Sequence, residues 1–249
     1  MRPASQVKFI PGIGREYDSG LVNDSDSTLD GYVCRAVCDL NSTRYKWEPA
    51  TFTTSFEVPP PPNSARGQAV FLFPGMQGLS NEKDEKSRVK TILQPVLEWN
   101  NDELCEWRVR SWVVKGTREA GLNISARTIA HTVKPGDHLT AYITYWGAND
   151  ARHRYSCGFD NIDSVNLDVS TDFTLNEVGV ALEVAHIFKN NIISQLPTTK
   201  EIGFYDTHFS LDQTNTNIDF NWKIVYGLPA GRTTMVADSQ ESVVIKLES

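Results

Sequence analysis

An amide and a carboxylate share one face of the segment "TILQPVLEW" at 91–99, where Gln94 and Glu98 stand four residues apart. An extended chain alternates its side chains between two faces, so both point the same way, beside Ile92 and Val96. Either this face is wet and ordinary, or it lines a concave site, in which case Gln94 and Glu98 are candidate catalytic residues.

Two further segments, 106–114 and 138–146, repeat this division into a mixed face and a more apolar face. The apolar faces belong in a core between two sheets, and a curved sheet would turn the mixed faces into a trough. Aromatic walls with a few polar groups are typical of a small-molecule or peptide cleft. The side chains that we assign to this trough are Arg110 as a catalytic residue, and Trp112, Tyr142 and Trp146 as substrate contacts.

Three residues from later segments complete the candidate set. His186 lies in "VGVALEVAHIFKNNI" at 178–192, where strand and helix periodicities compete, and it could carry a proton during catalysis. A structural role is the alternative for this histidine. Glu183 from the same segment and Tyr205 from the segment 201–211 are taken as further substrate contacts.

The elements that must position these residues are β-strands. Short runs of β-branched and aromatic residues recur along the chain, separated by turn sequences such as "KPGD" and "GLPAGR". Because no strand–helix–strand alternation is present, the pattern predicts an all-β antiparallel sandwich or barrel. The four prolines at 59–62 end a strand more simply than they link two domains. We expect a polar N-terminal arm at 1–28 and a single β-sandwich domain at 29–249.

Composition limits the classes of partner. The chain has 249 residues, 40% of them hydrophobic, which is enough for a core. Its net charge of −7, without any long Lys/Arg-rich segment, argues against nucleic acid. No apolar run approaches the ~20 residues of a membrane span. Because edge strands of sandwiches can pair, either a monomer or a homodimer is expected.

Cysteine and asparagine motifs favour the secretory or extracellular route. Three N-glycosylation acceptor sequences begin at Asn23, Asn41 and Asn123. Four cysteines could form two disulfides, for example Cys34 with Cys38 and Cys105 with Cys157. Four free thiols are the alternative. The N-terminus lacks the apolar core of a signal peptide, which we expect to have been removed.

Motifs for metals and cofactors are weak. The segment "DNIDSVNLD", with Asp160, Asp163 and Asp168, lacks the glycine and terminal glutamate of an EF-hand loop. No G-x-S-x-G sequence is present, and "PGIGRE" at 11–16 is neither preceded by a strand nor followed by a helix. We therefore expect neither a metal site nor a cofactor.

The order of several segments resembles the glutamic peptidase (eqolisin) family of fungi, over roughly residues 30–210. The segments are "DGYVCRA", "ATFTTSFEVPPPP", "QAVFLFPGMQG", "TILQPVLEWN", "EWRVRSWVV", "VKPGDHLTAYITY", "GVALEVAHI" and "IGFYDTHFS". The resemblance implies a concanavalin A-like sandwich, or jelly roll, of two curved antiparallel sheets. It also implies that Gln94 stands where the family has its catalytic glutamine.

The family's catalytic glutamate has no clear counterpart. An ungapped match places it at Gly179 or Ala181, and only a shift brings in Glu183. An odd shift would turn Glu183 to the opposite face of its strand. Pro95 also follows Gln94 where the family has threonine, and Ser111 stands where a carboxylate is expected. A divergent member without the general base is the reading that these departures favour.

Three functions remain open at this stage. The first is a cofactor-independent biosynthetic enzyme of fungal secondary metabolism that binds an apolar small molecule in the cleft. It would catalyse dehydration, cyclisation or cycloaddition, similar in kind to the hetero-Diels–Alderases, because holding reactants in one geometry alone lowers a barrier. The second is a secreted acid glutamic endopeptidase, with Glu183 or Glu98 as the base. The third is a carbohydrate- or ligand-binding sandwich.

Overall fold

The computed structural model describes residues 28–40, 49–63, 67–101, 104–188, 192–212, 216–227 and 232–248. Asn23, Asn41 and the predicted arm lie outside these residues, except for Thr28, at which the first strand begins. The predictions that concern them therefore remain predictions.

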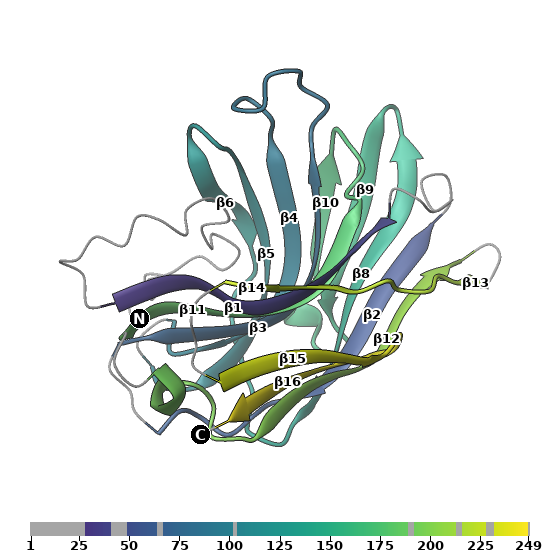
Figure 1. Ribbon diagram of the computed structural model, residues 1–249. Helices are drawn as coiled ribbons and strands as arrows, with labels where there is room; N and C mark the ends of the chain where they lie inside the picture. Colours follow the sequence, from purple (N-terminus) through teal and green to yellow (C-terminus); the bar gives the residue numbers. More distant parts are fainter. Residues whose placement is uncertain are drawn as a thin grey trace.

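The described residues form two antiparallel sheets of eight strands each (Figure 1). The first sheet has the order β14 (Lys223–Tyr226), β1 (Thr28–Asp39), β11 (Glu177–Phe188), β3 (Ala69–Leu79), β4 (Lys90–Trp99), β5 (Trp107–Thr117) and β6 (Gly121–Arg127), with β7 (His131–Thr132) beside β5. The second has the order β10 (Leu167–Thr171), β9 (Arg152–Phe159), β8 (His138–Asn149), β2 (Ala50–Glu57), β12 (Glu201–Leu211), β16 (Ser242–Glu248) and β15 (Arg232–Ser239), with β13 (Thr216–Asn217) beside β12.

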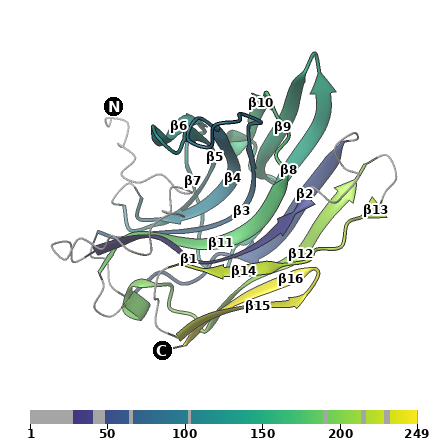
Figure 2. The same cartoon turned by 45° about the horizontal axis from the view of Figure 1, so that its top comes forward.

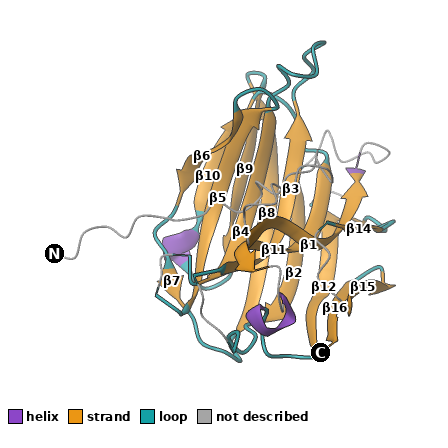
Figure 3. Ribbon diagram, turned by 60° about the vertical axis from the view of Figure 1, so that its left-hand side comes forward, coloured by secondary structure: helices purple, strands orange, loops and turns teal. Residues whose placement is uncertain are grey.

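The described ranges contain two complete 3₁₀ turns, η3 (Asp163–Val165) and η4 (Ile192–Gln195), and a single 3₁₀ residue at Leu40 after β1 (Figure 3). None of the described helices is long or apolar enough to cross a membrane. The two-sheet architecture confirms the predicted all-β antiparallel sandwich.

The segment in which helix and strand periodicities compete forms β11. It pairs with β1 on one side and with β3 on the other, in the centre of the first sheet. Both faces of β11 are largely buried, so its apolar residues run almost without interruption instead of alternating. This explains why periodicity alone could not separate strand from helix.

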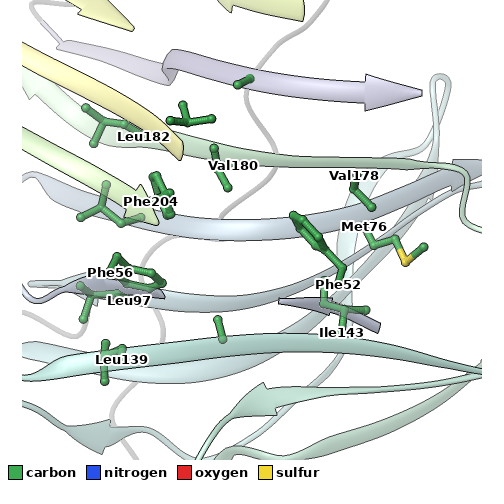
Figure 4. Close-up of a cluster of buried hydrophobic side chains, with 14 of the residues drawn as sticks. Phe52, Phe56, Met76, Leu97, Leu139, Ile143, Val178, Val180, Leu182 and Phe204 are labelled. Atoms are coloured by element: carbon green, nitrogen blue, oxygen red, sulfur yellow. The ribbon is translucent and has the colours of Figure 1, made fainter. Parts of the chain in front are cut away.

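The main core lies between the two sheets (Figure 4). Strand β2 alternates regularly and directs Phe52 and Phe56 inward. The ring of Phe56 lies 5.2 Å from that of Phe204 and 6.3 Å from that of Phe159. The apolar faces predicted for the mixed strands are in this core, as expected, with Leu93, Leu97, Val109, Val113, Leu139 and Ile143.

A second, smaller apolar cluster is buried on the opposite face of the first sheet, which we call the front face. It includes Phe71, Phe73, Ile92, Val96 and Trp112, from β3, β4 and β5. The sheet bends strongly, so that β4, β5 and β6 rise steeply while β1, β11 and β3 run across the molecule (Figure 1). The front face is the mixed face of β4 and β5 on which the sequence placed the candidate site.

The two predicted disulfides are wrong, because all four cysteines are free. Cys34 and Cys38 lie four residues apart on one straight run of β1, about 13 Å at ~3.3 Å per residue, whereas disulfide-bonded Cα atoms lie within ~7 Å. Cys105 is exposed, while Cys157 is completely buried in the core. The disulfide argument for secretion therefore no longer holds. Asn123 is exposed on β6, and its glycosylation remains a prediction.

Candidate functional site

The register between β4 and β5 brings the first candidates together on the front face. Gln94 pairs directly with Trp112, and Glu98 pairs with Arg108. Both Gln94 and Trp112 are completely buried. The amide and the indole do share one face, but neither side chain is accessible to solvent and neither lines the hollow described below, so the prediction that both face an open trough is wrong.

Glu98 is held in a buried ion pair. Its Oε1 atom lies 2.8 Å from Nε of Arg110, and Asn101 Nδ2 donates a hydrogen bond of 3.0 Å to its Oε2 atom. The Glu98 side chain is 1% exposed and that of Arg110 is 5% exposed. Because a buried charge requires such partners, this carboxylate and this guanidinium compensate each other. Glu98 is therefore poorly placed to act as a free general base.

Trp112 lies between two guanidinium groups. The Cζ atoms of Arg110 and Arg127 stand 5.5 Å and 5.7 Å from its ring. Both distances are within the range of cation–π attraction. The indole Nε1 atom has no hydrogen-bond partner among the described residues. The ring therefore contributes packing and electrostatic support to the front face.

Glu183 also lies on the front face. It pairs with Tyr32 of β1 and with Phe71 of β3, and Phe71 pairs in turn with Glu98. Glu183 is four residues from Gly179 along β11, and because four is an even number the two residues share one face. Glu183 is nevertheless about 13 Å from the position of Gly179, which is too far for it to replace a side chain there.

The row of Gln94 contains two glycines on the neighbouring strands. Met76 pairs with Leu93, which places Gly75 level with Gln94, and Gly75 pairs with Gly179 on β11. The residue of β11 that lies level with Gln94 therefore has no side chain.

Four predicted site residues lie elsewhere. Tyr142 and Trp146 belong to β8 and Tyr205 to β12, all in the second sheet. Trp146 is 52% exposed, with its Nε1 atom donating to Ser156 Oγ at 2.8 Å, and Tyr205 is 43% exposed. His186 is exposed near the end of β11, at a positive φ of 60°. Alternation within each strand was read correctly, but it does not show which sheet a strand joins.

A hollow of about 330 Å³, including open solvent at its mouth, lies on the front face over β1, β11, β3 and β4. These four strands are neighbours in the sheet (Figure 2). Gly75 and Gly179 form part of its lining, together with the apolar side chains of Val37, Phe73 and Ile92. Its polar lining residues are Tyr32, Arg35, Gln77 and Glu177.

The two glycines differ in the space around them, because the backbone of β1 lies against Gly179 while Gly75 has room for a side chain. A Cβ atom on Gly179 would lie 2.6 Å from the carbonyl oxygen of Ala36, so a larger residue does not fit there without movement. A Cβ atom on Gly75 would meet nothing closer than 3.5 Å. Glycine is uncommon inside strands and often marks a close approach of another chain or a ligand. Glycines within "PGMQG" and "EVGVA" are thus the sequence signal that could have located this site.

The residues considered for metal binding are not arranged as a metal site. In the described parts of the chain, no group of three or more His, Cys, Asp or Glu side chains could hold an ion. His153 Nδ1 is 3.0 Å from the hydroxyl of Tyr145, and burial lowers the pKa of His153. Burial raises the pKa of Cys157 to about 12, so this thiol is protonated at neutral pH.

Neither a family model nor a curated protein matches the chain. Among solved structures, it is similar to scytalido-glutamic peptidase with a peptide-based transition-state analogue, with a TM-score of 0.48, 10% identity, and coverage of 88% of this chain and 100% of that chain. SCP-B, a member of the eqolisin family in complex with the tripeptide Ala-Ile-His, gives the same four values.

A glycoside hydrolase family 16 endo-glucanase from Bacteroides ovatus follows, with a TM-score of 0.38, 14% identity, and coverage of 81% and 86%. The first two structures belong to the family that the sequence segments resemble. At these identities and scores the similarity assigns no activity, so the residues of the site must decide.

Proposed function

We propose that the protein binds an apolar small molecule in the hollow of the front face and converts it in a ring-forming reaction without a cofactor. The observation that carries this proposal is the glycine-lined hollow, in which Gly75 and Gly179 stand level with the buried amide of Gln94. The hollow therefore lies beside the row of Gln94, where these two positions carry no side chain.

The lining of the hollow fits a small organic molecule. Phe73, Ile92 and Val37 supply apolar walls, while polar groups are few and stand apart from them. Its volume of about 330 Å³ includes open solvent, so the hollow is an open depression in the sheet and not an enclosed cavity of that size.

The proposed cycloaddition depends more on how the site holds the two reactants than on reactive side chains. A hetero-Diels–Alder addition forms one C–C and one C–O bond from the π electrons of the two partners, and no atom is lost. Holding the two partners in a reactive geometry can alone supply ~7–11 kcal/mol of barrier reduction. Gln94 lies in the row of Gly75, and the Glu98–Arg110 pair stabilises the same face of the sheet at a distance from the hollow.

An acid endopeptidase is the second candidate, because an amide and two glutamates do share the front face. The comparisons also name glutamic peptidases, although their scores assign no activity. Against this candidate, Glu98 is paired with Arg110, and Glu183 lies four residues along β11 from the row of Gln94. A peptidase without a placed base lacks the group that activates water.

Carbohydrate binding is the third candidate, and one observation favours it. Trp146 is half exposed on the second sheet, and its hydrogen bond to Ser156 fixes the orientation of the indole. Exposed aromatic rings of this kind can stack on sugars. A glycan array with the wild-type protein and Trp146→Ala tests this candidate separately, since the change leaves the front face untouched.

The decisive experiment compares two reactions of the same preparation. In the first, an ortho-quinone methide generated in buffer reacts with ethyl vinyl ether, and the rate and enantiomeric excess of the chroman product are measured. In the second, denatured casein is incubated at pH 2–4. We expect enantiomerically enriched chroman from the wild type, racemic product from Gly75→Leu, and intact casein in both cases.

Two results would contradict the proposed function. Casein cleavage that is lost in Gln94→Ala but kept in the matched amide variant Gln77→Ala would establish the peptidase and overturn our proposal. Racemic chroman formed at the background rate by the wild type would also count against it. Far-UV circular dichroism of each variant shows whether a loss of activity reflects a loss of fold.

A further inference from the structure

The hollow has opposite charges at its two ends. Arg35 of β1 pairs with Ala181 of β11, whereas Glu177 of β11 pairs with Asp39 of β1. Ala181 and Glu177 are four residues apart along β11, which corresponds to about 13 Å at ~3.3 Å per residue. Arg35 and Glu177 both line the hollow, so the charge changes sign along its length.

The positive end is built for an oxygen acceptor. The Cζ atom of Arg35 lies 5.1 Å from the ring centre of Tyr32, so the guanidinium is positioned over an aromatic face. A guanidinium presents several N–H donors in one plane and prefers carboxylate, phenolate or carbonyl oxygens. Tyr32 also lines the hollow and adds an aromatic surface at this end.

The negative end is built for a donor. Gln77 Nε2 donates a hydrogen bond to Glu177 Oε1, which restrains that carboxylate at the wall of the hollow. Asp39 stands opposite Glu177 in the register of β1 and β11, so two acidic residues meet at this end. An anionic group placed here would be repelled, whereas a hydroxyl or an amine could donate to the carboxylate.

The middle of the hollow is apolar. Gly75 and Gly179 carry no side chains, and Phe73 and Ile92 stand beside them. A planar, ring-containing body fits this section, because aromatic and aliphatic walls favour it and no polar side chain interrupts it.

We infer that the ligand of the hollow is an elongated, ring-containing molecule that binds in one orientation, with an acidic or carbonyl oxygen toward Arg35 and a hydroxyl or amine toward Glu177. This inference rests on the proposed function and adds the substrate class to it. It follows that a single negative charge on the ligand improves binding through Arg35, while a ligand with an acidic group at both ends is rejected.

Two fluorescent probes of similar size test this orientation. One is 8-anilinonaphthalene-1-sulfonate, which carries one negative charge, and the other is neutral N-phenyl-1-naphthylamine. We expect Arg35→Met to weaken binding of the sulfonate about tenfold, which corresponds to ~1.4 kcal/mol, and to change binding of the neutral probe less than about twofold. Glu177→Gln should leave the sulfonate bound as tightly as in the wild type, or more tightly.

The control is Arg154→Met, which removes an exposed arginine of β9 in the second sheet. It should change neither affinity, and urea unfolding shows whether each variant is folded. Both probes could bind the wild type and lose affinity in Gly75→Leu, while Arg35→Met affects them equally or not at all. That result would overturn the proposed orientation but would still identify the hollow as the binding site. If neither probe responds to Gly75→Leu, the proposed function itself fails.

Discussion

Among single residues, the pair formed by Glu98 and Arg110 places two compensating charges inside the front face. Removing one partner should cost far more than removing both, because a lone buried charge has lost its compensation. We predict that Arg110→Met lowers the free energy of unfolding by ~3–5 kcal/mol and that adding Glu98→Gln restores part of it.

Urea unfolding at pH 7 measures this effect, and the exposed pair of Arg152 and Asp172, 3.2 Å apart, supplies the control. Arg152→Met should cost less than ~1 kcal/mol, since solvent screens an exposed pair. Equal losses for Arg110→Met and Arg152→Met would show that the front-face pair is not buried in solution.

The buried thiols make stability depend on alkaline pH. Burial raises the pKa of Cys34 and of Cys157 from 9.0 to about 12. The unfolded chain therefore releases these protons first, so the stabilisation is complete below pH 9 and is lost as the pH rises toward 12. At pH 10.5 each thiol should account for ~2 kcal/mol of lost stability.

The measurement is the urea midpoint at pH 8 and pH 10.5. Cys34→Ala and Cys157→Ala should each reduce the pH dependence, while Cys105→Ala, at the exposed cysteine, should not. A disulfide-exchange reagent at pH 8 should label Cys105 in the native protein, and Cys34, Cys38 and Cys157 only after unfolding. A pH dependence that is the same in all three variants would contradict the burial of these thiols.

Among the strands, the two glycines of the hollow should respond differently to the same change. We predict that Gly179→Ala costs ~1–3 kcal/mol of stability, because its Cβ atom would lie 2.6 Å from a backbone oxygen. Gly75→Ala, with 3.5 Å to its nearest neighbour, should change stability by less than ~1 kcal/mol. Chemical unfolding of the two variants side by side checks this, and the reverse order would place the hollow elsewhere.

Strand alternation explains what could be predicted from the sequence and what could not. It is a local property, so Gln94 and Trp112 were placed correctly on one face of β4 and β5. Sheet membership depends on partners distant in the sequence, so Tyr142, Trp146 and Tyr205 were assigned to the wrong sheet. The sequence analysis did not identify Arg35, Gly75 and Gly179 as site residues, because they line the hollow only through strand neighbours that are distant in the sequence.

Several strands escaped prediction for a related reason. In β6 every second residue is exposed and none is fully buried, so the segment lacks the apolar run by which we identified strands. The helix-like periodicity at 178–192 arose because β11 is buried on both faces. The sequence therefore predicts the sandwich from its inward-facing strands better than it predicts the edges.

At the scale of the whole molecule, stability depends on the contact between the two sheets. Leu97 is completely buried in the inter-sheet core, whereas Leu79, at the end of β3, is 50% exposed. We predict that Leu97→Ala lowers the free energy of unfolding by ~2–5 kcal/mol and that Leu79→Ala lowers it by less than ~1 kcal/mol. Urea unfolding of this matched pair checks the layer arrangement, and similar losses would contradict it.

The most direct test of the central claim is the dissociation constant of N-phenyl-1-naphthylamine for three proteins. Gly75→Leu fills the hollow, while Thr53→Leu adds the same side chain to β2 in the other sheet. The account predicts that the wild type and Thr53→Leu bind the probe equally and that Gly75→Leu binds it at least about tenfold more weakly. Equal binding by all three folded proteins would contradict the claim that the front-face hollow is the ligand site.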